Sequence, residues 1–283
     1  MKTVIYAACI LFAYTASSQA QVSIQARVSH NLLAEGEPVA MTLEIMNQTA
    51  APLDLTSMCN EGSFTIHVQS QSGRHYEMKH APIFSRSHVL QPWMSTSVVV
   101  NLQRHFDIHY TDAYSVYARI TADGRSYASD RVLFDVVPGA KMGKIQVGVA
   151  LDGGRYRTYR LLSIQRKRSE YLFLHIMNED EGVHYGTHEL GRIIKLFKPV
   201  LRADREGNVH VLHQSGPTQY THASFTPFGA PLNISLYAAE ISKIRLEAVE
   251  GGKLVVRGGK PISQDTKSLR RDTYDSTVTV PEF

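Results

Sequence analysis

The stretch Tyr114-Ser115-Val116-Tyr117-Ala118-Arg119-Ile120 decides the fold class of this chain. Apolar and polar positions alternate along it with a period of two. Side chains of a β-strand point alternately to opposite faces of a sheet, so this pattern predicts a strand with one buried face. A helix of the same length would need apolar residues three or four positions apart, and that spacing is scarce throughout the chain.

Similar alternation recurs on both sides of this stretch, with turn residues between the repeats. The cleanest example is Val39–Ile45, where Val39, Met41, Leu43 and Ile45 share one face. Short strands at intervals of about 8–12 residues are typical of a β-sandwich. The expected strands of this region, besides these two, are Val22–Val28, Leu53–Thr56, Phe64–Val68, His75–Met78, Ser97–Leu102 and Val132–Val137.

Several motifs in this region match a known kind of domain. They are Gly36-Glu37-Pro38-Val39 before a strand that ends at Asn47-Gln48-Thr49, Leu90-Gln91-Pro92 before another strand, and Asp112-Ala113-Tyr114. With them, residues 22–137 resemble bacterial immunoglobulin-like domains, and among these the BsuPI-type proteinase-inhibitor domain.

The resemblance implies an immunoglobulin-like β-sandwich and a tyrosine corner at Tyr114, in which the phenol hydroxyl bonds to an upstream backbone group. The glycine usual in the family before that tyrosine is absent, because Asp112-Ala113 stand there. The matching motifs are structural, so they predict a fold and say little about activity.

The chain divides into an N-terminal sandwich at 21–137, a linker at 138–143 and a second antiparallel β domain at 144–259. Proline and glycines in the linker interrupt the strand pattern. From Lys260 the alternation fails, and residues 260–283 are predicted to form a disordered polar tail.

The second domain contains short internal echoes that predict repeated hairpins. Glu206-Gly207-Asn208 and Glu250-Gly251-Gly252 each precede an apolar strand, and Tyr185-Gly186-Thr187-His188 is echoed by Gln219-Tyr220-Thr221-His222. The region loosely resembles propeller-like repeats of secreted bacterial proteins, sialidases among them. It is too short for the blades that a closed propeller requires. An open β-meander or a small sandwich is therefore predicted.

The N-terminus predicts export. Lys2 precedes the apolar run Val4–Tyr14, which is too short to cross a hydrocarbon core of ~30 Å as a helix. Ser18-Gln19-Ala20 fits a signal-peptidase site, so residues 1–20 are predicted to be cleaved after Ala20. A secreted or periplasmic protein results. No later stretch is apolar enough for a transmembrane segment.

Composition narrows the classes of function. Of two cysteines, Cys9 leaves with the signal peptide, so Cys59 has no internal disulfide partner and is expected to be buried. The net charge of +4 comes without a dense basic stripe, so no nucleic-acid partner is predicted. Arg166-Lys167-Arg168 is expected at a hairpin tip, open to an anionic surface or a glycan.

No catalytic residue, metal site or cofactor is predicted. The sequence has no Gly-x-Ser-x-Gly elbow and no glycine loop for phosphate between a strand and a helix. Close histidine pairs can ligate zinc, but on strands and turns these side chains do not converge as they would on a helix. The pairs are His105/His109, His184/His188 and His210/His213.

Two groups of residues are candidates for ligand binding. One is the set Tyr185, His188, His213, Tyr220 and His222, whose rings can either line a shared sugar-binding surface or pack between hairpins. The other is Trp93, which follows a proline in an expected loop. It is either an anchor for a partner or a lid over the sandwich core.

These observations favour an exported, non-enzymatic binding or structural protein whose ligand is a protein or a glycan. A glycan-acting hydrolase is the first alternative, with acids drawn from Asp204, Glu189 and Glu206. A protease inhibitor acting through the N-terminal domain is the second.

Overall fold

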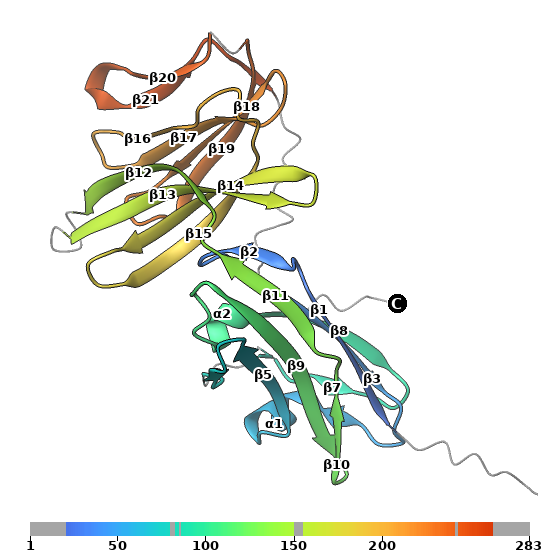
Figure 1. Cartoon of the computed structure of the whole chain (residues 1–283). Helices are drawn as coiled ribbons and strands as arrows, with labels where there is room; N and C mark the ends of the chain where they lie inside the picture. The colour runs from blue at the N-terminus through green and yellow to red at the C-terminus, as the bar shows by residue number, and fades with distance from the viewer. Residues whose placement is uncertain (1–20, 80–82, 85, 150–154, 241–242, 263–283) are drawn as a thin grey trace, which may run out of the picture.

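The computed structural model describes residues 21–79, 83–84, 86–149, 155–240 and 243–262. The predicted signal peptide therefore lies outside the described residues. The described chain is nearly all β-strand and has only two short α-helices, which confirms the all-β fold class (Figure 1).

The N-terminal part is a sandwich of two sheets, with one core between them. The first sheet has the order β1-β3-β8, made by Val22–Val28, Ala40–Asn47 and Ser95–Asn101. The second has the order β2-β11-β9-β5-β6, with β10 paired to β9, and comprises Leu32–Ala34, Val132–Val137, Asp112–Ala122, Phe64–Ser70, His75–Tyr76 and Arg125–Ala128.

Alternation along the sequence explains which side chains fill this core. Val39, Met41, Leu43 and Ile45 are all fully buried, as their shared face predicts. The hydroxyl of the buried Tyr114 donates to the carbonyl of Tyr110 at 2.7 Å, which confirms the expected tyrosine corner.

One expected strand is cut short by a helix. Leu53–Asp54 form only the short strand β4, which pairs with β7 (Val89–Leu90). Helix α1 (Leu55–Asn60) then begins, because the carboxylate of Asp54 accepts hydrogen bonds from the first free backbone N–H groups. A second short helix, α2, spans Leu102–His105.

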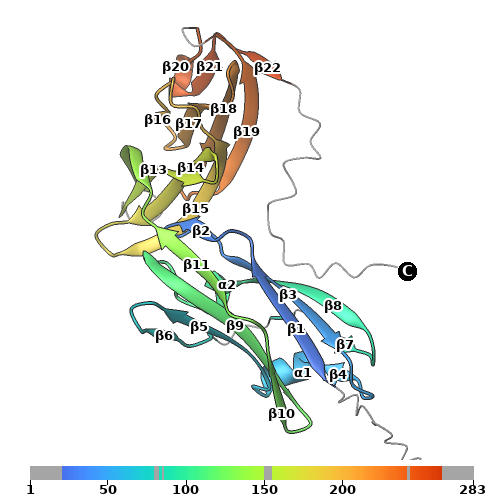
Figure 2. The same cartoon turned by 45° about the vertical axis from the view of Figure 1, so that its right-hand side comes forward.

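The C-terminal part is a small sandwich, which is one of the two forms that its hairpins predict (Figure 2). One sheet contains β12 (Ala140–Val149), β13 (Arg155–Arg166), β14 (Ser169–Asn178) and β15 (Val183–Arg192). The other contains β16 (Val200–Ala203), β17 (Val209–Gln214), β18 (Gln219–Phe225), β19 (Pro231–Ala238) and β22 (Lys260–Ile262). The core between them includes Tyr159, Leu161, Leu174, Val211 and Phe225.

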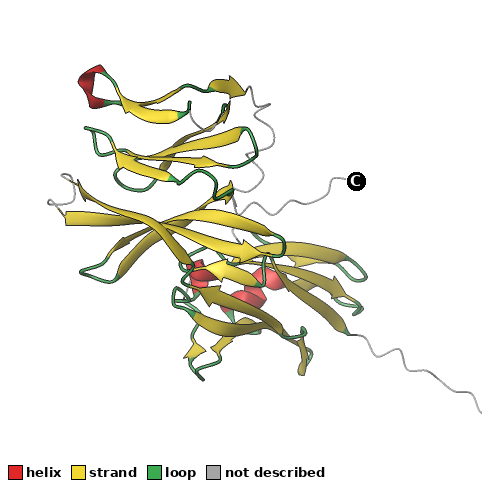
Figure 3. Ribbon diagram, turned by 45° about the horizontal axis from the view of Figure 1, so that its top comes forward, coloured by secondary structure: helices red, strands yellow, loops and turns green. Residues whose placement is uncertain are grey.

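The echoed turn motifs do form equivalent hairpins. The turn at Glu206-Gly207 joins β16 to β17. The 3-10 turn η2 (Glu250–Gly252), drawn in red at the top of Figure 3, joins β20 (Arg245–Ala248) to β21 (Leu254–Arg257). Gly207 and Gly251 have φ values of 82° and 81°, a conformation that side chains disfavour. The repeat in the sequence therefore reflects a repeated turn geometry.

Two segments are shorter than the sequence suggested. Of residues 138–143, expected in a linker, only Pro138 and Gly139 lie outside strands, because β12 begins at Ala140. Of residues 260–283, expected in a disordered tail, Lys260–Ile262 form β22 and pair with β19. Residues 263–283 lie outside the described residues.

The turn after β2 packs against the C-terminal sandwich. The hydroxyl of Thr187 donates to the carbonyl of Glu35 at 2.6 Å and lies 2.7 Å from Nδ1 of His175. Gly36 has a φ of +72°, and a Cβ there would lie 2.8 Å from the Thr187 hydroxyl. Only glycine lets this turn approach β14 and β15 so closely.

Arg166 corrects one expectation, because its side chain is buried rather than exposed at a hairpin tip. It pairs with the buried carboxylate of Glu37, and its Nε donates to the carbonyl of Leu32 at 2.9 Å. Its Nη1 lies 3.0 Å from the carboxylate of Glu189. Lys167, with a φ of 54°, makes the turn itself. Arg166 therefore joins the two sandwiches and is not open to an external anion.

Substitution of Gly36 tests this packing. Gly36→Ala should lower the free energy of unfolding by about 1–3 kcal/mol more than Gly62→Ala, measured by urea denaturation. Both glycines have positive φ, but a Cβ at Gly62 meets nothing within 4 Å. The control thus carries only the left-handed backbone strain, about 1–2 kcal/mol. Equal losses for the two variants would contradict the close approach at Gly36.

Candidate functional site

Three of the expected ligand-binding residues are buried in the C-terminal part. His213 and Tyr220 are 0% exposed, and His222 is 8% exposed. His213 shares the face of β17 that carries Val211, which packs between the two sheets. Tyr220 lies on the opposite face of the sheet, in contact with Phe197.

The other two residues of that set pack against neighbouring side chains. The guanidinium carbon of Arg157 lies 3.9 Å from the ring centroid of Tyr185. The ring of His188 lies 5.0 Å from that of Phe225. All five side chains are thus buried or packed against neighbouring side chains, which favours the alternative that they pack between hairpins.

A polar network that the sequence did not reveal surrounds Asp204. His210 Nε2 lies 3.2 Å from Asp204 Oδ2, and His210 Nδ1 lies 3.1 Å from His222 Nε2. Asn208 donates to the same carboxylate through its backbone N–H and its side chain. Although burial acts to raise the pKa of Asp204, these hydrogen bonds hold it below its usual value. Asp204 is thus an ionised carboxylate that fixes a turn.

The acids proposed for a hydrolase do not form an opposed pair. Asp204 and Glu206 share one turn, and both accept from the side-chain amide of Asn208. Glu189 is engaged by Arg166. Glycosidases place two carboxyl groups on opposite sides of the bond they cleave. The cavity of about 470 Å³ beside this turn does not offer that arrangement with Asp204 and Glu206.

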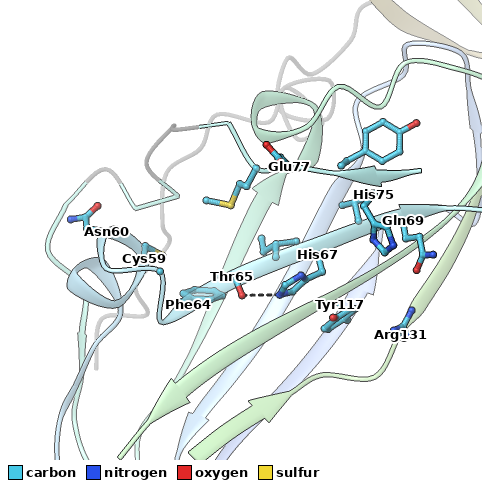
Figure 4. Close-up of a pocket in the computed structure, with 15 residues that line it drawn as sticks. Cys59, Asn60, Phe64, Thr65, His67, Gln69, His75, Glu77, Tyr117 and Arg131 are labelled. Atoms are coloured by element: carbon cyan, nitrogen blue, oxygen red, sulfur yellow. Dashed lines mark hydrogen bonds between the residues drawn. The ribbon is translucent and has the colours of Figure 1, made fainter. Parts of the chain in front are cut away.

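A different cavity, of about 560 Å³, lies beside β5 in the N-terminal sandwich (Figure 4). Its volume is within the range of about 300–1,000 Å³ common for small-molecule sites. Polar and aromatic side chains from β5, β6 and β9 dominate its outer part. They are Thr65, His67, Gln69, His75 and Tyr117, joined by Arg131.

Tyr117 organises this outer part of the cavity. The His67 ring stacks on it at 4.7 Å between centroids and 11° between planes. The guanidinium carbon of Arg131 lies 4.9 Å from the same ring and that of Arg119 lies 5.8 Å away. His67 is held in turn by a contact of 2.9 Å between its Nε2 and the Thr65 hydroxyl. Cation–π attraction thus orients the arginines before any ligand arrives.

The charges near Tyr117 make this corner electropositive. The pKa of His67 is lowered by burial and then by the positive charges of Arg119, Arg131 and His75. Within the described residues, no carboxylate pairs with Arg119 or Arg131. Glu77 also lines the cavity, on the other side of β5 from Tyr117 and Arg131 (Figure 4). An anionic group is therefore favoured at the Tyr117 end.

Cys59 lies at the far end of the same cavity, in helix α1, and is half-buried rather than fully buried as expected. Burial raises the pKa of its thiol to about 12. The thiolate, which is the reactive form, is therefore scarce at neutral pH.

Trp93 is 63% exposed, which excludes its role as a lid over the core. It occupies the third position of a turn closed by Met94 N–H and the Gln91 carbonyl at 3.2 Å. Its φ of 66° is a conformation that costs a non-glycine residue about 1–2 kcal/mol. Because the side chain is exposed, its burial does not offset this conformational cost. Strain of this kind is common at binding sites, so it is consistent with Trp93 as an anchor for a binding partner.

No protein-family model matches the chain, and no curated protein matches it. The likeness of residues 22–137 to BsuPI-type domains therefore stays an expectation from their sequence. Within the described part of the chain, no helix is long and apolar enough to cross a membrane. The same residues contain no cluster of three or more acidic, histidine or cysteine side chains suited to a metal ion.

Buried histidines predict a pH-dependent stability. Burial lowers the pKa of His175, His213 and His222 from 6.5 to about 4. Between these values the unfolded chain binds protons that the folded chain does not. The contribution of these histidines to the free energy of unfolding should therefore be greatest above pH 6.5. It should fall as the pH is lowered toward 4, by on the order of 3 kcal/mol for one such histidine.

Urea denaturation at several pH values between 7.5 and 4.5 measures this dependence. His175→Gln should flatten the slope between pH 6.5 and 5, whereas the exposed His75→Gln should leave it unchanged. A free energy of unfolding that does not change between pH 6.5 and 5 in the unmodified protein would contradict the prediction.

Proposed function

We propose that this protein is an exported, non-enzymatic binding protein whose cavity beside β5 takes a carboxylate-bearing saccharide. The observation that carries the proposal is Tyr117, stacked with His67 and approached by Arg131, which has no carboxylate partner among the described residues. An oriented guanidinium without a counter-ion favours a ligand that brings its own carboxylate.

The remaining lining side chains suit the hydroxyl groups of a sugar. Thr65 and Gln69 can each donate and accept hydrogen bonds, and His75 can do either according to its tautomer. Glu77 can accept from hydroxyl groups but repels a second negative charge. A saccharide with one acidic group therefore fits this lining better than a polyanion or an acidic peptide does.

The predicted export of the chain also supports this proposal. Lys2, the apolar run Val4–Tyr14 and the Ser18-x-Ala20 site would deliver the mature chain to the periplasm or the medium, where acidic saccharides are accessible ligands. The hydrolase alternative gains no support from Asp204, because that carboxylate holds a turn. Inhibition of a protease stays a prediction from sequence resemblance.

Titration calorimetry with a short galacturonate oligosaccharide tests the proposal, with the neutral galactose oligosaccharide of equal length as the matched ligand. The acidic ligand should bind, and binding should weaken as salt is added. Arg131→Gln should reduce affinity at least about tenfold, or 1.4 kcal/mol. The control Arg27→Gln removes an exposed arginine from the other sheet and should have no effect.

Equal binding of the neutral oligosaccharide, or equal affinity in Arg131→Gln and the unmodified protein, would refute this assignment. Thermal denaturation of each variant establishes that the fold is intact before the affinities are compared.

A further inference from the structure

Three histidine rings meet at the boundary between the two sandwiches. His109 lies before β9 in the N-terminal sandwich, and its ring stacks on that of His184 in β15, at 5.6 Å between centroids and 12° between planes. The ring of His175 in β14 lies 5.2 Å from that of His184. Figure 1 shows β15 beside β2, where the sandwiches touch. We name these three residues the histidine cluster. They are not arranged to hold a metal ion, so the chemistry they share is the binding of protons.

Hydrogen bonds fix the neutral form of His175. The Thr187 hydroxyl uses its one proton to donate to the carbonyl of Glu35, so it can only accept from Nδ1 of His175, 2.7 Å away. The other ring nitrogen, Nε2, is buried and has no hydrogen-bond partner among the described residues. A second proton on His175 would therefore create a buried positive charge and a buried N–H donor without an acceptor.

His109 and His184 are placed in a similar way. Nδ1 of each ring is buried and has no hydrogen-bond partner in the described part of the chain. The Tyr110 ring packs edge-on against His184 at 6.2 Å. Asp107 favours a charged His109, with Oδ1 3.3 Å from Nε2, but this carboxylate is 51% exposed and Lys79 opposes its effect. Water therefore weakens the attraction that Asp107 offers to a protonated ring.

Neighbouring cations make a charged His175 still less favourable. Arg160, which pairs with Glu179, acts on His175 together with the rings of His184 and His109. Burial and these positive charges bring the pKa of His175 to about 4. Burial also lowers the pKa of His109. While the sandwiches are joined, His109 and His175 are therefore neutral at pH 7.

We propose that acid separates the two sandwiches at the histidine cluster while each sandwich stays folded. Separation gives every ring of the cluster water as a hydrogen-bond partner and moves the positive charges apart. The separated form therefore binds protons that the joined form does not, so its share is lowest above pH 6.5 and rises as the pH falls toward 4. Hydration of His175 alone favours the separated form about 30-fold at pH 5.

The other links between the sandwiches allow this movement. Burial raises the pKa of Glu37, so acid removes the charge of this carboxylate sooner than that of an exposed one and weakens its pair with Arg166. Between β11 and β12, only Pro138 and Gly139 lie outside strands. Backbone rotation at these two residues changes the relative orientation of the sandwiches without breaking a strand.

Small-angle X-ray scattering of the chain that follows the predicted cleavage site measures the separation. The radius of gyration should be constant above pH 7 and increase between pH 6.5 and 5, while the far-UV circular dichroism stays unchanged. His175→Asn keeps an amide that can donate to the Thr187 hydroxyl but cannot take up a proton. It should lose most of the increase, because the ratio of separated to joined protein at pH 5 falls about 30-fold.

Two further variants locate the effect in the cluster. His184→Gln removes the central ring and should also reduce the increase of the radius of gyration. His75→Gln removes an exposed histidine outside the cluster and should behave as the unmodified chain does.

Three outcomes would overturn the proposal. One is a radius of gyration that does not change between pH 7.5 and 5 in the unmodified chain. Another is an equal increase in His175→Asn, His184→Gln and the unmodified chain, because it would assign the movement to the pair of Glu37 and Arg166 alone. The third is an increase that accompanies a loss of circular dichroism, because the sandwiches would then unfold rather than separate.

Discussion

The buried ion pair between Arg166 and Glu37 is the interaction on which the arrangement of the two sandwiches depends. Both side chains are about 8% exposed. Burial raises the pKa of Glu37 despite the opposing effects of the Ala34 N–H and of Arg166. Arg166 also lies with its guanidinium carbon 4.9 Å from the ring centroid of Phe173. Because an unpaired buried charge is costly, a movement that separates Glu37 from Arg166 while either group stays buried is unfavourable.

Because of this ion pair, one end of the N-terminal sandwich contacts the C-terminal sandwich and the other end does not. The turn that carries Glu35 and Gly36 packs against β14 and β15, while the backbone N–H of Trp93 donates to the carbonyl of Asn47, at the other end of the sandwich where β3 ends. The outer face around Tyr117 remains open between these ends. The two joined sandwiches thus leave the face around Tyr117 accessible to the proposed saccharide.

The sequence predicted well what depends on local periodicity. The apolar face of Val39–Ile45 follows from alternation, and the tyrosine corner at Tyr114 follows from the resemblance to immunoglobulin-like domains. It failed for Arg166, which stands in a run of three basic residues that looks exposed. Its partner Glu37 is 129 residues away, and no local pattern reveals such a contact.

The candidate site was missed for the same physical reason. The sequence places Tyr117 on the outward face of a strand. Its neighbour His67 comes from β5, which pairs with β9 although the two strands are far apart in the sequence. The repeated Tyr and His residues of the C-terminal part looked functional because they recur. Recurrence in a sandwich reflects equivalent strand positions, and at Tyr220 and His222 those positions are buried.

A double-mutant cycle between Glu37 and Arg166, followed by urea denaturation, tests most directly whether this pair joins the sandwiches. Arg166→Met should cost about 3–5 kcal/mol of unfolding free energy, because it leaves the buried carboxylate of Glu37 without its guanidinium partner. Glu37→Leu should cost less than Arg166→Met, because Arg166 keeps its contact with Glu189. The double variant should be more stable than either single one, with a coupling of about 2 kcal/mol or more. Additive losses, or single losses no larger than the ~1 kcal/mol of a surface pair, would contradict the account.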